Sequence, residues 1–289
     1  MIIDIDEQDF LKLIKKLVED KTPSEEILSK YESIALKFNS AQISSVFIRI
    51  DGCKLKEHQR IIIDSKNAKC CADIVDVKGV DTDELKTIIL NSTDADAIIS
   101  CAIIFYNKGL DVSEFDKKVV KLKDPVASCN FCEKIQSANI PEHETIVKNS
   151  MKAKLCADFI IKVKLGMSSE DLLDAIMESG EYEYIVDVAN NEKLLDIENI
   201  RRYVLLKIIK HKDPLACYLY AVNVKNANRV LLLNIALLNP DPTYNNIKER
   251  CKEELSYEIM DKTELEQAIS DYRKELREPK KQERHPSYF

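Results

Sequence analysis

The sequence predicts an all-α protein built of repeated helical hairpins, and three observations support this prediction. A segment of sixteen residues occurs twice in the same register, at 124–139 and at 213–228. Both copies open with Asp-Pro and continue with apolar residues at helical spacing. The 289 residues include only five glycines and eight prolines, which leaves little material for tight turns or phosphate-binding loops. Internal repeats of this kind determine architecture before any single motif does.

The better copy, residues 124–139, is predicted to begin with an α-helix. The Asp124 side chain can accept hydrogen bonds from first-turn amides, and Pro125 occupies a position whose amide has no partner in a helix. Apolar residues then recur on one face of the helix. After a short polar break, a second helical run is expected over 141–147, again with a proline at its start. One copy is therefore a helical hairpin.

Weaker copies fill the chain between residues 24 and 240, for example 68–75 against 153–160. The first copy is irregular, because residues 51–56 interrupt it. Each copy has a small anchor residue in its first helix, which lets neighbouring helices approach closely. The anchors are Ala35, Ala72, Ala102, Cys132, Ala157, Ala189 and Ala221. In the sixth copy, Glu183 aligns almost as well as Ala189. The alignment predicts about seven hairpins of about 25–37 residues each.

The two ends of the chain are predicted to differ from the hairpins. Residues 1–23 are expected to carry an N-terminal capping helix, amphipathic over 6–19, that covers the first hairpin. Residues 241–276 are expected to form C-terminal helices. Residues 277–289 are rich in charge and proline, and they are expected to be a disordered charged tail.

Composition favours a cytoplasmic protein that does not enter a membrane. Hydrophobic residues make up 45% of the chain, charged residues 32%, and the mean hydropathy is -0.25. No apolar run approaches the roughly 18 residues of a membrane span. The N-terminal residues are acidic, whereas a secretory signal is basic there.

Nine cysteines are the most conspicuous chemical feature. Cys129 and Cys132 have the spacing of a zinc half-site or a redox pair, which is one alternative. In the repeat alignment, however, three cysteines share one position with aromatic residues of other copies: Cys71, Cys101, Cys156, Phe131 and Tyr220. Such a position belongs to the core. We therefore expect buried, reduced thiols and neither a metal nor a cofactor.

Catalytic signatures are absent from the sequence. His58, His143, His211 and His285 have no acidic or cysteine partner at ligand spacing, so we expect them on the solvated surface. The sequence contains no Gly-x-Ser-x-Gly motif, Walker loop or dinucleotide fingerprint. We therefore expect a protein that is not an enzyme.

The charge balance disfavours a nucleic-acid partner. The net charge is -7 and the pI is about 5.4, whereas affinity for nucleic acid comes largely from Lys and Arg. The chain has no Trp on which bases could stack. A nucleic-acid-directed helical-repeat protein, including a DNA-repair-like enzyme, stays open as the alternative, mainly through the charged tail.

The repeat resembles the two-helix unit of α-solenoids and is similar to HEAT-like arrays with a shorter unit. The resemblance covers residues 24–240 and rests on the pattern Asp-Pro-[Val/Leu]-Ala-x-x-x-[Phe/Tyr]-[Cys/Ala]-x-x-[Ile/Val]-x-x-Ala-Asn. It implies an α-solenoid that binds a protein partner along an extended surface, as a scaffold, adaptor or inhibitor. The composition is typical of a low-GC genome, such as that of a viral or mobile element.

In solenoids of this class, the second helices of successive hairpins line one surface, which is the candidate partner site. Along this row the charge changes from acidic to basic between the fifth and sixth hairpins. Tyr and Arg, types enriched at binding hot spots, occur at the change. The alternative is an ordinary solvated face. The candidate residues are Glu170, Asp171, Asp174, Glu178, Tyr182, Tyr184, Arg201, Arg202, Lys207 and Arg229.

Overall fold

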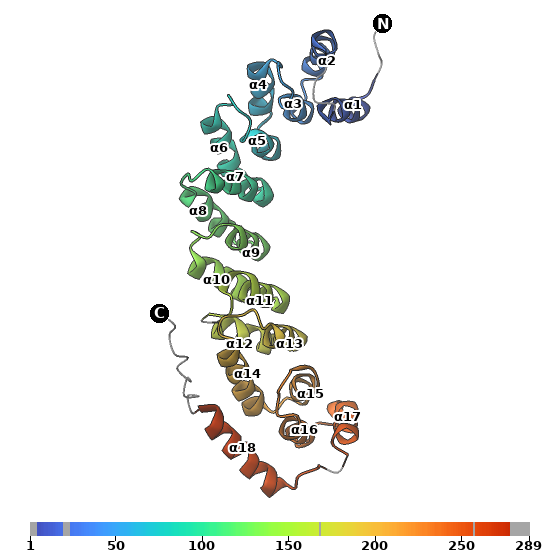
Figure 1. Ribbon diagram of the computed structural model, residues 1–289, viewed down its shortest axis with the longest axis vertical. Helices are drawn as coiled ribbons and strands as arrows, with labels where there is room; N and C mark the ends of the chain where they lie inside the picture. Colours follow the sequence, from blue (N-terminus) through green and yellow to red (C-terminus); the bar gives the residue numbers. More distant parts are fainter. Residues whose placement is uncertain (1–4, 20–23, 168, 257, 278–289) are drawn as a thin grey trace, which may run out of the picture. The chain divides into compact units, whose positions relative to one another are not determined.

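The computed structural model describes residues 5–19, 24–167, 169–256 and 258–277. Within these ranges all regular secondary structure is helical, with eighteen α-helices, one π-helical turn and one 3₁₀ turn (Figure 1). The predicted all-α class is confirmed. The chain divides into two compact units, residues 1–146 and 147–289, which are described separately below.

The first unit arranges its helices in two rows. Consecutive members of the odd-numbered row, α1 to α9, pack on one another, and α4, α6 and α8 do the same in the even-numbered row. Helices α3, α5 and α7 also pack on the even helices before and after them. The bounds are α1 (Glu7–Glu19), α2 (Glu25–Phe38), α3 (Ala41–Phe47), α4 (Leu55–Ser65), α5 (Ala68–Ile74), α6 (Thr82–Asn91), α7 (Ala95–Asn107), α8 (Ser113–Leu122), α9 (Pro125–Lys134) and α10 (Ile140–Asn149), whose last turn belongs to the second unit.

The second unit repeats this alternation. Helices α11, α13, α15 and α17 pack in sequence, α12 packs on α14, and α18 packs on both α14 and α16. The bounds are α11 (Ala153–Phe159), the π-turn η1 (Ile160–Lys164), α12 (Glu170–Ser179), α13 (Glu183–Asn190), α14 (Ile197–His211), α15 (Pro214–Asn223), α16 (Arg229–Leu237), the 3₁₀ turn η2 (Pro242–Tyr244), α17 (Asn245–Leu255) and α18 (Lys262–Arg277).

One turn recurs between an even helix and the odd helix that follows it. A residue with positive φ occurs at intervals of about 30 residues, with one copy missing after α6: Asn39, Lys66, Lys123, Met151, Gly180 and Lys212. In three of these turns and in the turn after α6, a serine Oγ donates to the carbonyl three residues earlier and accepts from the amide two residues later: Ser65, Ser92, Ser150 and Ser179. The chain therefore reverses direction in nearly the same way at successive junctions between an even helix and the next odd helix.

The two Asp-Pro segments start helices as predicted. Asp124 Oδ1 accepts from the amides of Val126 at 2.8 Å and Ala127 at 3.1 Å, and Pro125 is the first helical residue. Asp213 Oδ1 accepts from the Ala216 amide at 3.0 Å in the second copy. Both helix starts are therefore capped by a side chain and begin with proline.

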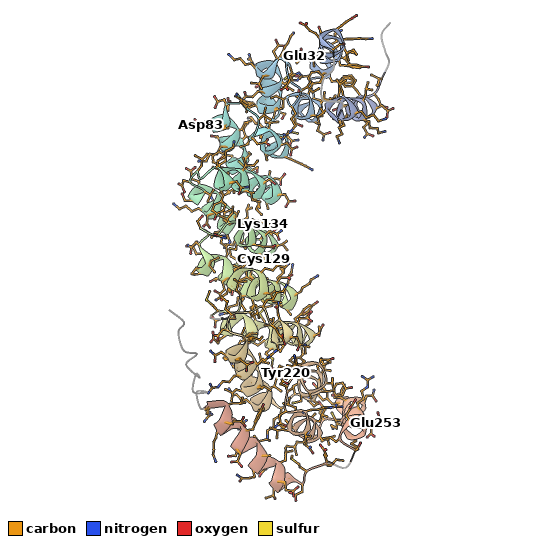
Figure 2. The ribbon with its side chains drawn as sticks, viewed as in Figure 1. Glu32, Asp83, Cys129, Lys134, Tyr220 and Glu253 are labelled. Carbon is orange, nitrogen blue, oxygen red and sulfur yellow. The ribbon has the colours of Figure 1, made fainter. Side chains whose placement is uncertain are left out.

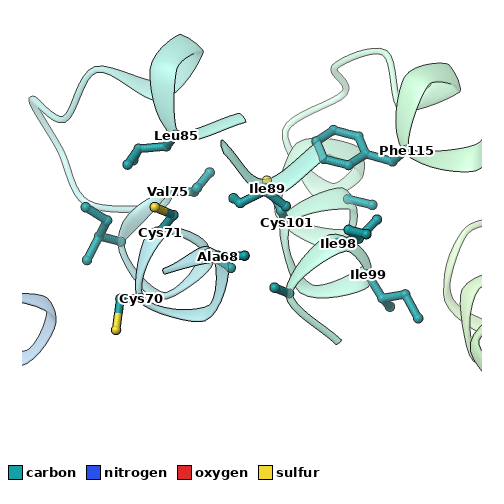
Figure 3. Packing of buried hydrophobic residues seen from close by; sticks show 14 of the residues in the cluster. Ala68, Cys70, Cys71, Val75, Leu85, Ile89, Ile98, Ile99, Cys101 and Phe115 are labelled. Atoms are coloured by element: carbon teal, nitrogen blue, oxygen red, sulfur yellow. The ribbon is translucent and has the colours of Figure 1, made fainter. Parts of the chain in front are cut away.

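The aligned positions form the core. All seven anchor residues are buried, and so are Cys71, Cys101, Phe131, Cys156 and Tyr220 at the shared aromatic position. Tyr220 is labelled in Figure 2. Figure 3 shows Cys71 and Cys101 among the apolar side chains of α5, α6 and α7. Eight of the nine cysteines are buried and Cys53 is half-buried, so the prediction of core thiols is confirmed.

The first hairpin was placed wrongly by the sequence alignment. Its anchor Ala35 lies in α2, an even-numbered helix, whereas the other anchors lie in odd-numbered helices. Residues 24–67 contain three helices, α2, α3 and α4, and not one irregular hairpin. At the ends, α1 lies in the segment 6–19 that is expected to be helical, and α17 and α18 are the helices expected in the C-terminal segment. The predicted tail beyond Arg277 lies outside the described residues.

The prediction that the histidines are surface residues is wrong for two of the four. His58 on α4 and His143 on α10 are fully buried, His211 is exposed, and His285 lies outside the described residues. The His58 ring stacks on Phe47 at a centroid distance of 4.9 Å, and the His143 ring stacks on Phe131 at 5.5 Å. Both histidines therefore lie in the core. One ring nitrogen of His58 pairs with Ser44, and one ring nitrogen of His143 pairs with Asp116.

A buried acid accompanies each histidine and also holds the start of its helix. Asp116 on α8 accepts from His143 Nε2 through Oδ1 at 2.9 Å and from the Asn139 amide through Oδ2 at 2.7 Å. Glu32 on α2, which is labelled in Figure 2, accepts from the Lys54 amide, and its Oε1 lies 3.6 Å from His58 Nε2. His58 Nδ1 is hydrogen-bonded to Ser44 Oγ at 3.2 Å. An acid on one even helix thus fixes the next even helix.

Overpacking a buried anchor position is expected to destabilise the protein. Ala221 on α15 is buried, so Ala221→Leu should reduce the free energy of unfolding by about 1–3 kcal/mol. The control Glu178→Gln changes an exposed side chain and should alter it by no more than about 0.5 kcal/mol. Urea denaturation of both variants tests this, and equal midpoints would contradict the packing assignment.

Acid is expected to destabilise the protein partly through His58. Burial lowers the pKa of His58, against the opposing effect of Glu32 and Glu57, while Lys54 acts with burial. The unfolded chain therefore binds the proton more readily, and stability is lost as pH falls below about 6.5. Thermal unfolding should show that the wild type loses more stability than His58→Gln between about pH 7.5 and pH 5.5. Equal losses in both proteins would refute the assignment.

Candidate functional site

The negative charge of the protein is concentrated in α12, α13 and their flanking loops. Residues 165–200 contain ten Asp or Glu and one Lys, whereas the rest of the chain has 40 acidic and 42 basic residues. The stretch is therefore the source of the net charge of -7. Four of the predicted site residues, Glu170, Asp171, Asp174 and Glu178, belong to its helix α12.

The acidic residues of α12 differ in what they contact. Asp171 forms an ion pair with Lys148 at 3.2 Å. Glu170 and Glu178 are exposed, and neither has an ion-pair partner within the described part of the chain. These two carboxylates therefore remain available to a partner.

Asp174 links α12 to α14 and brings two of the predicted site residues together. Its Oδ2 accepts from Lys207 Nζ at 2.8 Å, and its Oδ1 accepts from Tyr203 Oη at 2.9 Å. Lys207 Nζ also lies 5.0 Å from the centre of the Tyr203 ring. The hydrogen bond to Asp174 raises the pKa of Lys207, so the ion pair persists at neutral pH. This contact joins neighbouring even helices.

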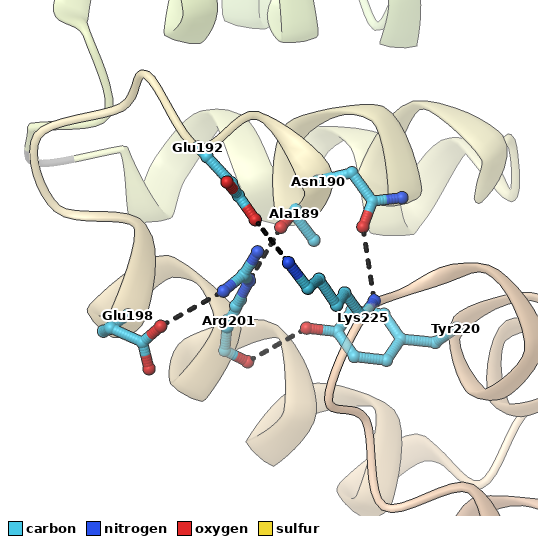
Figure 4. A network of polar contacts seen from close by, with 7 residues as sticks. All are labelled: Ala189, Asn190, Glu192, Glu198, Arg201, Tyr220 and Lys225. Atoms are coloured by element: carbon cyan, nitrogen blue, oxygen red, sulfur yellow. Dashed lines mark hydrogen bonds and ion pairs between the residues drawn. The ribbon is translucent and has the colours of Figure 1, made fainter.

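Arg201 is held inside the second unit by polar contacts that Figure 4 shows. Its Nε donates to the Ala189 carbonyl at 2.8 Å, and its Nη1 lies 3.1 Å from Glu198 Oε1. Tyr220 Oη donates to the Arg201 carbonyl at 3.5 Å. Only 14% of the Arg201 side chain is exposed. Arg201, on α14, therefore supplies a donor to a carbonyl near the C-terminal end of α13 and also contacts α15. The C-terminal end of a helix favours a positively charged side chain.

A second set of contacts lies beside Arg201 in Figure 4. Lys225 Nζ pairs with Glu192 at 3.4 Å, and the Lys225 amide donates to Asn190 Oδ1 at 3.4 Å. Asn190 Nδ2 donates in turn to the Asn223 carbonyl at 2.8 Å. These contacts fasten the loop after α15 to the end of α13.

The remaining predicted site residues have separate surroundings. Arg202 is half-buried and has no ion-pair partner among the described residues. Arg229 on α16 pairs with Glu254 on α17. Tyr182 and Tyr184 are half-buried, and burial together with Asp213 raises the pKa of Tyr182 to about 12. Tyr182 therefore contacts Asp213, the N-cap residue of α15.

The thiols of Cys53, Cys71, Cys101 and Cys132 are poor nucleophiles at neutral pH. Burial raises the pKa of Cys71 and of Cys101 to about 12, and that of Cys53 to about 11. Burial and then Asp116 also raise the pKa of Cys132. The thiolate is the reactive form and the usual metal ligand, so these side chains are unreactive where they lie. Within the described ranges, no three His, Cys, Asp or Glu residues are grouped as metal ligands.

None of the helices that the structure describes has the length and apolar character needed to span a membrane. Comparison of the chain with protein-family models, with curated proteins and with solved structures finds no match.

The two adjacent arginines are expected to differ in their effect on stability. Arg201→Ala leaves the Ala189 carbonyl without the side chain that donates to it, which should cost about 1–3 kcal/mol. Arg202→Ala removes no ion pair of the described chain and should cost about 0.5 kcal/mol or less. Urea denaturation of the full chain measures both, and similar losses would argue against a special role for Arg201.

Proposed function

We propose that this protein is a non-enzymatic, protein-binding α-solenoid of about seven helical hairpins, acting as a scaffold, adaptor or inhibitor. The recurring turn supports the repeat architecture, since residues with positive φ such as Lys123, Met151 and Gly180 return at intervals of about 30 residues. Row packing supports it as well, because odd-numbered helices contact the next odd-numbered helix within each unit.

The observation that carries the binding proposal is the exposed, unpaired charge on one hairpin. Where each hairpin packs only on its neighbours, the outward sides of its helices stay exposed and form a continuous surface for partners. Glu170 and Glu178 are exposed without ion-pair partners in the described structure, and Arg202 lies on the following even helix. We propose that these residues of the candidate site contact the partner, while Asp174, Arg201 and Lys207 hold the surface in shape.

We also propose a cytoplasmic location. All nine cysteines are free thiols, which are kept reduced in the cytoplasm and are oxidised in most secreted proteins.

Affinity purification tests the proposed function. The tagged full chain, expressed in its native host and recovered after nuclease treatment, should retain a protein partner that mass spectrometry identifies and that binds again as a purified component. Binding of the purified chain to duplex and single-stranded DNA should be weak at physiological salt, because the chain carries a net charge of -7. Nuclease-sensitive complexes, together with tight DNA binding that falls steeply with salt, would instead favour the nucleic-acid-directed alternative.

A further inference from the structure

Three large apolar side chains are exposed on two neighbouring loops of the second unit. Leu165 and Met167 follow the π-turn η1, and Leu195 precedes α14. Their exposed fractions are 44%, 53% and 70%, and Leu195 is the most exposed large apolar residue in the part of the chain that the structure describes. A row of exposed apolar side chains costs solubility, so it often marks an interaction site.

The two loops are held together by backbone contacts. The Leu195 amide donates to the Leu165 carbonyl at 2.9 Å, and the Gly166 amide donates to the Ile160 carbonyl at 3.1 Å. Gly166 has a φ of +88°, and a Cβ there would lie 2.9 Å from Ile200 Cδ1 and 3.1 Å from Leu194 Cβ. Only glycine fits this close approach. The exposed side chains are therefore presented by a fixed backbone, which lowers the entropy lost on binding.

Acidic residues flank these loops along the chain and outnumber the neighbouring Lys164 and Lys193. Glu170 and Asp171 begin α12 directly after the first loop, and Glu192 lies in the second loop. Glu198 lies in the first turn of α14. All four are exposed, and three of them pair with Lys148, Lys225 or Arg201. The pairs of Asp171 with Lys148 and of Glu192 with Lys225 are exposed and contribute only about 0–1 kcal/mol each, so a cation from outside can compete for these two carboxylates. The single Lys of residues 165–200 does little to offset ten acidic residues.

We propose that Leu165, Met167 and Leu195, with Glu170 and Glu192 at their edge, form a docking patch for a basic segment of a partner protein that carries bulky apolar side chains. This inference rests on the proposed function and specifies the chemistry of the partner. An apolar centre with a polar rim is the usual anatomy of a protein interface. Lys and Arg beside the apolar anchors complement the acidic rim and speed association. The same charge repels nucleic acid, anionic membranes and acidic segments.

Peptide selection tests the docking patch directly, because it requires no purified partner. A displayed library of random linear peptides is selected on the full chain, and the best peptide is synthesised with a fluorescent label for anisotropy measurements. We expect the selected peptides to be enriched in Lys or Arg together with Leu, Phe or Met. We expect affinity for the chosen peptide to fall at least tenfold with Leu195→Ser, and to weaken as salt concentration rises.

Two matched controls separate the patch from general effects. Ile259→Ser removes an apolar side chain as exposed as Met167 but outside the patch, and it should leave affinity unchanged. The double variant Glu170→Gln, Glu192→Gln should weaken binding about tenfold, whereas Glu181→Gln, Glu183→Gln removes the same charge elsewhere and should have less than half that effect. Circular dichroism checks that each variant is folded.

Each other outcome overturns the docking patch. Failure to select any peptide, selection of acidic peptides, or equal binding to wild type and Leu195→Ser would each refute it. Equal binding to wild type and variant would leave the proposed function standing and move the interface elsewhere. The proposed function itself fails only if affinity purification also recovers no protein partner.

Discussion

The structure depends on polar contacts that tie one even-numbered helix to the next. The first amides of a helix have no partners within it, so each helix start needs an acceptor from outside. In the first unit Glu32 and Asp116 supply that acceptor to the helix two places further along the chain, and Gln59 does so by exchanging hydrogen bonds with both backbone groups of Asp81. Apolar packing brings the rows together, whereas these contacts determine where each helix begins.

The second unit uses the same principle with different side chains. Asp174 reaches Tyr203 and Lys207 on the following even helix, and Asn234 on α16 bonds to backbone groups of Glu258 and Met260 just before α18. Each contact pairs a polar group that is at least partly buried, which avoids the cost of an unsatisfied donor or acceptor. The donors and acceptors differ from one pair of helices to the next. Each helix can therefore make its contact with only one neighbouring helix, and only in one alignment along that helix.

The sequence predicts the features that depend on residues close together in the chain. The Asp-Pro starts, the capping residues Asp124 and Asp213 and the buried anchors follow from local pattern. The burial of the two histidines could not be predicted, because their partners Glu32 and Asp116 lie about one repeat earlier in the chain. One partner is a glutamate and the other an aspartate, so no common residue marks the position. Among the candidate site residues, charge pattern places Glu170 and Glu178 on the surface but does not reveal that Arg201 is engaged. Leu195 follows the buried Leu194, and sequence alone does not distinguish them.

The buried Asp116–His143 contact restricts how such an array of hairpins can grow in evolution. Copying the hairpin that contains His143 without the one that contains Asp116 would leave a buried histidine facing a neighbour that offers no acceptor. A duplication survives only if it copies adjoining hairpins together or is followed by compensating substitutions at the new junction. Lengthening of this chain is therefore expected to proceed by blocks, and the boundaries of those blocks should fall between residues that do not share a buried polar contact.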